Sequence, residues 1–303
     1  MTRVAAIDVG SNTVLCLVAE RASDGSLCRV VDRATITGLG RGAFERGTLD
    51  DAAIARTIDA VRAHALEARA LGATRLRGVG TSALRDARDR QRFVALAREA
   101  LDAFDVISGD EEARLTFEGA AAGLVLPDGE RTVLDIGGGS TEIAIGQSTP
   151  RERTSLQLGS VRLFERHLAS DPPSLAEIAA LEADVDRALD AHRIGELPPL
   201  LALAGTATTV ACVARGLRFE EIDRVQGVVL ERDEIAAVAR ELASRTSQER
   251  RRDPRIEPAR ADVLVAGAIL FARVAARSAS TRVTISDGGL RWALAADLLA
   301  SAG

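Results

Sequence analysis

Two short segments of the sequence combine an aspartate with a turn of glycine and hydroxyl residues. The first is Asp8-Val9-Gly10-Ser11-Asn12, and the second is Asp135-Ile136-Gly137-Gly138-Gly139-Ser140-Thr141-Glu142. Glycine lets successive backbone amides approach a phosphate, because it tolerates positive φ and has no side chain in the way. Carboxylates are the hard oxygen ligands that Mg²⁺ prefers. One such segment alone is better explained as an ordinary hairpin turn, but two copies favour a site for phosphate and a metal ion.

Four further segments carry candidate groups, each with an ordinary alternative. Gly205-Thr206-Ala207 opens a helix whose free amides would attract an anion, although a plain capped helix fits equally well. The turn Asp287-Gly288-Gly289 precedes the last expected helix in the same way. Arg85 follows a strand end and offers a fork of donors to a phosphate, whereas most arginines simply lie on the surface. Glu112 lies in a first helical turn, where acids usually complement the helix dipole, so its position alone does not make it a base.

The elements that position these groups alternate between strands and helices, which is typical of an α/β fold. We expect strands at residues 4–8, 14–19, 76–80, 106–108, 132–136, 143–146, 200–204 and 283–286. Thr48 is expected to cap a helix that places Ile54, Ile58 and Val61 on one face. Other helices are expected at residues 90–101, 111–124, 174–191, 206–215, 233–244, 260–276 and 288–299.

The length of 303 residues and the spacing of the repeat predict two domains. The two aspartate-glycine segments are separated by about one domain length, and residues 126–129 supply turn chemistry just before the second copy. We therefore expect an N-terminal domain at 1–125, a C-terminal domain at 126–287, and a ligand in a cleft between them.

Composition excludes several classes of protein. The formal charge of −5 argues against a general nucleic-acid binder, which needs a net basic face. No apolar run reaches the roughly 18 residues of a spanning helix, and no signal-peptide pattern is present, so a cytoplasmic protein without membrane attachment is expected. Cys16, Cys28 and Cys212 lack metal-binding spacing and are expected to be reduced core residues.

Taken in order, these segments resemble the exopolyphosphatase and guanosine pentaphosphate phosphohydrolase (Ppx/GppA) family, in a short two-domain form. The matching stretches cover nearly the whole chain, at residues 6–13, 80–85, 107–115, 134–142, 158–162, 204–209, 260–267 and 287–291. The family shares the superfold of sugar kinases, Hsp70 and actin. The resemblance therefore implies two similar actin-like ATPase (ribonuclease H-like) domains that face a central cleft, a final helix at 288–303 that returns to the first domain, and a homodimer.

The resemblance also assigns roles to residues of this sequence. Glu112 matches the glutamate that activates the attacking water. The phosphate-binding positions are Gly10, Ser11, Asn12, Arg85, Gly137, Gly138, Gly139, Ser140, Thr141, Gly205, Thr206 and Ala207. Asp8, Asp135 and Glu142 match the metal-side acids, with Mg²⁺, or Mn²⁺ in its place, as the ion. Trp292 and Gln226 depart from the family's pattern, where glutamate and histidine are common, and their contacts are left unassigned.

The leading hypothesis is an exopolyphosphatase that releases terminal orthophosphate from inorganic polyphosphate. Hydrolysis of guanosine pentaphosphate (pppGpp) is the first alternative, because it is the same chemistry on a nucleotide. A small-molecule kinase of the same superfold, or a polyphosphate or nucleotide sensor without catalysis, is more remote. The paired glycine turns would serve all of these proteins, so it is Glu112, with the Arg85 and Gly205 segments, that favours a hydrolase.

Overall fold

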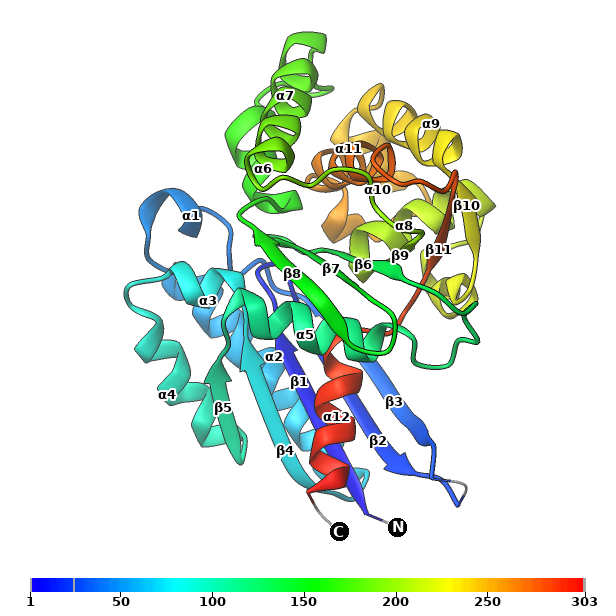
Figure 1. Ribbon diagram of the computed structural model, residues 1–303. Coiled ribbons are helices and arrows are strands. Elements are labelled where there is room, and N and C mark those ends of the chain that lie inside the picture. Colours follow the sequence, from blue (N-terminus) through cyan, green and yellow to red (C-terminus); the bar gives the residue numbers. More distant parts are fainter. Residues whose placement is uncertain (1, 24, 302–303) are drawn as a thin grey trace. The chain divides into compact units, whose positions relative to one another are not determined.

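The computed structural model describes residues 2–23 and 25–301. The chain divides into two compact units, Met1–Gly119 together with Leu290–Gly303, and Ala120–Gly289 (Figure 1). Each unit contains one β-sheet with helices packed on it. Among the described residues, no helix combines the length and apolar character needed to cross a membrane.

The first unit is built on a five-stranded sheet in the order β3-β2-β1-β4-β5. Its strands are β1 Arg3–Val9, β2 Thr13–Arg21, β3 Leu27–Ile36, β4 Ala73–Gly80 and β5 Ala103–Val106. β1 is antiparallel to β2 and parallel to β4, and β4 is parallel to β5. The carboxyl ends of β1, β4 and β5 therefore lie at one edge of the sheet, which is where open α/β sheets bind ligands.

Helices cover both faces of this first sheet, because successive residues of a strand point to opposite sides. Ala5 and Ile7 of β1 pack in a core with α2 and α4, while Val4 and Ala6 pack in a second core with α5 and α12. The helices of this unit are α1 Ala43–Arg46, α2 Asp51–Ala70, α3 Ser82–Asp86, α4 Arg90–Ala100, α5 Gly109–Ala120 and α12 Leu290–Ala300.

The second unit is built on a six-stranded sheet in the order β10-β11-β9-β6-β7-β8. Its strands are β6 Arg131–Ile136, β7 Thr141–Gly146, β8 Pro150–Leu156, β9 Leu200–Leu203, β10 Val229–Glu231 and β11 Arg282–Ile285. Its helices are α6 Ser160–His167, α7 Leu175–Ala191, α8 Ala204–Arg215, α9 Arg232–Ala243, α10 Ser247–Arg252 and α11 Leu264–Ala275. α11 is apolar on almost every side, and it is accordingly buried among α6, α7, α8 and α9.

The two sheets repeat the same strand order, with β6, β7, β8, β9 and β11 standing where β1, β2, β3, β4 and β5 stand. The pairing directions repeat as well, and the second sheet adds β10 at its edge. The predicted α/β fold with two similar halves is confirmed.

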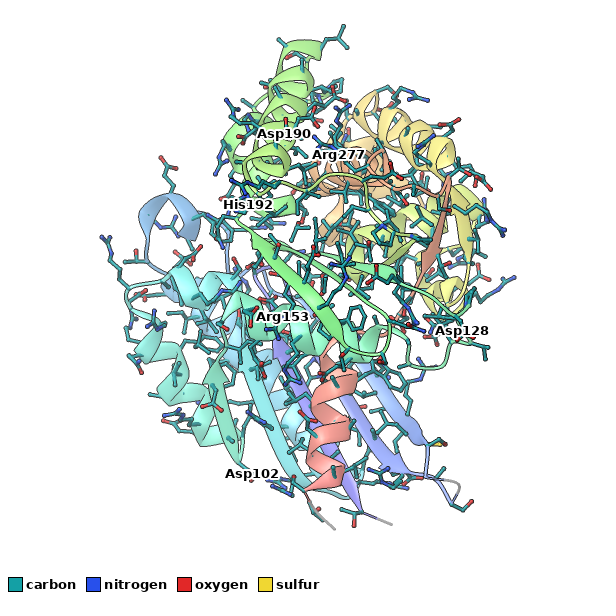
Figure 2. The ribbon with its side chains drawn as sticks, viewed as in Figure 1. Asp102, Asp128, Arg153, Asp190, His192 and Arg277 are labelled. Carbon is teal, nitrogen blue, oxygen red and sulfur yellow. The ribbon has the colours of Figure 1, made fainter. Side chains whose placement is uncertain are left out.

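Ion pairs hold the helices in place with very different degrees of burial. In the first unit, Arg291 of α12 pairs with Asp32 of β3 at 2.7 Å, and the two side chains are only 7% and 11% exposed. In the second unit, Arg277 Nη2 lies 2.7 Å from Asp190 Oδ1 in an ion pair at the protein surface. Both side chains are labelled in Figure 2. The buried pair ties α12 firmly to the sheet of the first unit.

Several sequence predictions of local structure were wrong. The strand predicted at 106–108 is β5, which ends at Val106, and the cap of α2 is Asp50 rather than Thr48, since Asp50 Oδ1 accepts a bond from the Ala53 amide at 3.0 Å. Cys28 is exposed, whereas Cys16 and Cys212 are buried as expected. Strands β3 and β8 were missed, because each lies at a sheet edge and alternates apolar with charged residues irregularly.

Candidate active site

The first glycine turn closes the β1–β2 hairpin and turns its carbonyl groups toward the rest of the protein. The Gly10 amide donates to the Thr13 carbonyl at 3.0 Å, the Gly40 amide to the Ser11 carbonyl at 2.7 Å, and the Thr37 amide to the Asn12 carbonyl at 2.9 Å. The amides of Ser11 and Asn12 donate to no described residue. Two adjacent amides are therefore available to an anion.

Buried polar atoms without a hydrogen-bond partner surround this turn. Asn12 Oδ1, Thr37 Oγ1 and Ser82 Oγ are buried and have no partner among the described residues. Ser82 is linked to the turn through its neighbour Ala83, whose amide donates to Ser11 Oγ at 3.1 Å. Such groups are costly unless a ligand or water satisfies them, so the turn has the character of a polar binding site. Ser82 lies in the segment already noted for Arg85, whereas nothing in the sequence pointed to Thr37.

Glu112 lies in the first turn of α5, directly after β5, and its side chain is buried. Arg85 Nη1 donates to Glu112 Oε2 at 2.5 Å and to the Ile107 carbonyl at 3.3 Å. Thr81, at the end of β4, also hydrogen-bonds the Glu112 carboxyl. The first unit thus brings Glu112 and Arg85 into direct contact at the edge that carries the Ser11 turn.

Burial raises the pKa of Glu112, because removing water disfavours the charged form of a carboxyl. Arg85 and the Thr81 hydrogen bond oppose this effect and favour the ionised form. A carboxylate whose pKa is raised toward neutrality is well suited to accept a proton. The sequence could not reveal this property, since the burial of Glu112 depends on the packing of α5 against the sheet.

The second glycine turn closes the β6–β7 hairpin with the same bond, from the Gly137 amide to the Ser140 carbonyl at 3.0 Å. The first amides of α6 bind the carbonyls of this turn, with Ser160 donating to Gly137 at 3.0 Å and Val161 to Gly138 at 2.9 Å. The amides of Gly138 and Gly139 donate to no described residue. This turn also offers two amides to an anion.

Two carboxylates and a hydroxyl form a row across the second hairpin. Asp135 of β6 is directly opposite Glu142 of β7, which is directly opposite Ser155 of β8. Ser155 Oγ donates to Glu142 Oε1 at 2.7 Å, and Glu142 is 1% exposed. Two hard oxygen donors on one face fit Mg²⁺, which usually binds one or two carboxylates and several waters.

The structure divides the predicted metal-side acids between the units. Asp8 belongs to the first unit, where Leu15 is opposite it, and Asp135 and Glu142 belong to the second. No group of three or more histidine, cysteine, aspartate or glutamate side chains able to hold a metal is found in residues 2–23 and 25–301. The pair in the second hairpin is therefore the stronger set of ligands.

The third glycine turn lies at the end of β9, the parallel neighbour of β6. Ala204 has a φ of 68°, an unfavourable conformation for a residue with a side chain, and such strain is concentrated at functional sites. The Arg260 guanidinium lies against the Cα of Gly205, where a Cβ would collide with it. Arg260 was not among the predicted site residues, although its sequence segment matched.

Some predicted site residues use their side chains inside the protein. The Thr141 hydroxyl donates to the Leu158 carbonyl at 2.8 Å, and the Ala207 side chain is part of the hydrophobic core. Thr206 lies beside Gly267 and Ser160, and Ser160 contacts the second turn. The second and third turns are thus neighbours within one unit.

Gln226 and Trp292 have structural roles. Gln226 Nε2 donates to the Ala122 carbonyl at 2.8 Å, and its Oε1 accepts from the Asp287 amide at 2.5 Å. Gln226 therefore joins the segments at which the chain enters and leaves the second unit. Trp292 packs against the core beneath α12.

Comparison with known proteins gives a consistent result. The Ppx/GppA phosphatase family model matches residues 17–302. Exopolyphosphatase 2 of Mycobacterium tuberculosis is 34% identical over 310 aligned positions, which cover 95% of each chain. A guanosine-5'-triphosphate,3'-diphosphate pyrophosphatase of Vibrio cholerae is 39% identical over 168 positions, which cover 54% of this chain and 33% of that protein.

Solved structures agree with this result. The crystal structure of an exopolyphosphatase-like protein superimposes with a TM-score of 0.92 at 30% identity, and it covers both chains completely. The Aquifex aeolicus member of the Ppx/GppA family superimposes with a TM-score of 0.83 at 29% identity, covering 100% of this chain and 99% of that one. The chain therefore belongs to the Ppx/GppA phosphatase family.

Proposed function

We propose that this protein is an exopolyphosphatase that removes orthophosphate from the end of inorganic polyphosphate. The observation that carries the proposal is the buried Glu112 carboxylate, held by Arg85 and Thr81 at the sheet edge that bears the Ser11 turn. A kinase would need a base for an acceptor hydroxyl, but membership of a phosphatase family favours water as the acceptor.

In the proposed reaction, Glu112 takes a proton from water as the water oxygen attacks the terminal phosphorus. The bond from that phosphorus to the bridging oxygen breaks, orthophosphate leaves, and the shortened chain keeps the bridging oxygen. The transition state of phosphoryl transfer spreads charge over the equatorial oxygens, so positioned donors supply most of the catalysis. The free amides of Ser11, Asn12, Gly138 and Gly139 are donors of this kind.

A metal ion is part of the proposal. Asp135 and Glu142 of the second unit would hold Mg²⁺, with Mn²⁺ as a substitute, and Ser155 would orient Glu142. In the first unit, Asp8 is proposed by itself as a metal-side acid. When bound, the ion would neutralise charge on the phosphate oxygens of the substrate. Arg260 beside Gly205 would add a guanidinium to the same task.

Polyphosphate is favoured over guanosine pentaphosphate by the extent of the matches. The exopolyphosphatase 2 match spans 95% of both chains, whereas the pyrophosphatase match leaves two thirds of that longer protein without a counterpart here. The nucleotide is retained as the second candidate because the aligned part is 39% identical. The proposal also includes a homodimer in the cytoplasm, and sedimentation velocity would measure the oligomeric state.

The decisive test is orthophosphate release by the Glu112→Gln variant. Loss of a general base should reduce turnover by about 10²–10⁴-fold, while substrate binding is retained. Glu111→Gln is the matched control, because Glu111 is the adjacent residue of α5 and pairs with Arg114 instead of Arg85. Near-normal turnover by Glu112→Gln would contradict the assignment.

The same assay chooses the substrate. Polyphosphates of increasing length and guanosine pentaphosphate would be compared with and without Mg²⁺. A higher kcat/KM for the nucleotide than for every polyphosphate would overturn the preferred substrate without affecting the role of Glu112.

A further inference from the structure

A pocket of about 540 Å³ lies beside the Arg85–Glu112 pair, entirely within the first unit. Its polar lining includes Arg85, Arg90, Arg98, Gln91 and Ser108, and it is bounded by α3, α4 and the end of β5. Of these five polar residues, only Arg85 belongs to the site described above. The pocket has the size of a small-ligand site.

The lining of this pocket is cationic. It contains the three guanidinium groups of Arg85, Arg90 and Arg98 and one carboxylate, that of Asp105, while Arg85 is also paired with Glu112 behind the lining. Asp105 is 3.5 Å from Arg98 Nη2 and is also shared with Arg77 at 3.7 Å. The lining therefore keeps an excess of positive charge.

Arg90 differs from Arg85 and Arg98 in having no acidic partner among the described residues. Its Nη1 donates to the Arg85 backbone carbonyl at 3.1 Å, and no carboxylate of the described residues lies within ion-pair distance of its guanidinium. Arg98 is anchored through Nε, which donates to the Phe104 carbonyl at 3.0 Å. Each backbone bond uses one nitrogen of a five-donor fork and holds the rest of the group toward the pocket lining.

We propose that this pocket is a second phosphate subsite, which binds one phosphoryl group through Arg90 and Arg98 next to Arg85. Arginine forks match the geometry of tetrahedral phosphate and bind it through paired, charge-assisted hydrogen bonds. The choice of phosphate rests on the proposed function, whose substrate and product both consist of phosphoryl groups. The occupant is either the released orthophosphate or a phosphoryl group of the substrate chain.

Equilibrium dialysis with radiolabelled orthophosphate tests the subsite without any turnover. The Arg90→Gln/Arg98→Gln double variant should bind one orthophosphate fewer per chain than the wild type, or bind it at least about tenfold more weakly, because charge-assisted contacts are lost. Arg98→Gln alone is the second variant, since it leaves the bond from Arg90 to the Arg85 carbonyl intact. Arg92→Gln is the matched control, because Arg92 lies on the same helix, outside the pocket, and pairs with Asp51.

Steady-state kinetics of the same variants distinguish the two sources of phosphate. A raised inhibition constant for orthophosphate with an unchanged KM identifies the product, and a raised KM for tripolyphosphate with an unchanged kcat identifies the substrate chain. Unchanged orthophosphate binding in both pocket variants, or an equal loss in Arg92→Gln, overturns the subsite. Orthophosphate binding is measured without turnover. The dialysis result therefore still decides the subsite if Glu112→Gln contradicts the proposed hydrolase.

Discussion

The β1–β2 and β6–β7 hairpins close with the same backbone bond but hold different side chains at corresponding positions. In each, a glycine amide binds the carbonyl three residues later at 3.0 Å, and the next two amides remain available. The residue opposite the strand-end aspartate is Leu15 in the first hairpin and Glu142 in the second. The repeated backbone thus supplies anion donors twice, whereas the facing pair of carboxylates occurs once.

A buried glutamate, in contrast, occurs at the corresponding position of the first unit alone among the described residues. The segment after β5 places the buried Glu112 on α5, while the segment after the corresponding strand, β11, contains Gly288 and Gly289 and leads into α12. The proposed base therefore belongs to the first unit, and the proposed metal-binding pair belongs to the second. A duplicated fold can thus keep the same glycine turns in both halves while the side chains around them differ.

The largest effect expected from this comparison is on metal affinity. Glu142→Gln removes one of two facing carboxylates, and it should raise the Mg²⁺ concentration for half-maximal activity by at least about 100-fold. Losing a residue that only hydrogen-bonds a metal ligand lowers metal affinity by up to about 100-fold, so the loss of a ligand itself should be no smaller. Asp8→Asn should have a smaller effect, because no acid faces Asp8 across its hairpin. Electron paramagnetic resonance of bound Mn²⁺ measures both variants without turnover. Equal losses would mean that the two hairpins contribute alike.

Glycines that support the turns provide the next contrast. A Cβ on Gly159 would lie 2.4 Å from the Gly138 carbonyl oxygen and would collide with the backbone. A Cβ on Gly40 would overlap less, at 2.9 Å from the Ser11 Cβ and 3.1 Å from both the Ser11 carbonyl oxygen and the Phe44 ring. Gly159→Ala should therefore destabilise the protein by about 1–3 kcal/mol, and Gly40→Ala by less. Thermal unfolding measures both, and a larger loss for Gly40→Ala would show that the first turn is the more rigid one.

Much of this architecture could be predicted from the sequence, because the strand-turn-strand repeat has strong local signals. The buried strands β1 and β9 have continuous apolar runs, and α7 begins with a capping box at Ser174. Edge strands such as β8 could not be found, since their charged residues face solvent and lack a clear pattern.

The site was predictable only where chemistry and local turn geometry coincide. The glycine turns were found in this way, but the roles of Arg85 and Arg260 depend on packing between distant segments. Arg85 contacts a carboxylate 27 residues away, and Arg260 lies against a glycine that follows a different strand. Long-range contacts of this kind are not visible in residue type or spacing.

The smallest expected effect concerns Thr81, which hydrogen-bonds Glu112. Glu112 must be ionised to accept a proton, so activity falls as the pH drops through its raised pKa. Thr81→Val removes a bond that favours the ionised form, which raises the pKa further and moves the acid limb of kcat/KM to higher pH. A hydrogen bond of about 0.5–1.5 kcal/mol corresponds to about a 2- to 13-fold loss of activity on that limb, with little change at high pH.

Thr206→Val is the matched control for this variant. Thr206 follows β9, the strand of the second unit that corresponds to β4, and the described part of the second unit has no counterpart of Glu112. It should change KM for the substrate without moving the acid limb, because a phosphate ligand affects binding at every pH, whereas a partner of the base affects only its ionisation. A pH profile measured for the two variants in parallel separates these effects. If Thr206→Val moved the acid limb as far as Thr81→Val, the group whose ionisation limits activity would not lie in the first unit. The proposed role of Glu112 as the base would then be wrong.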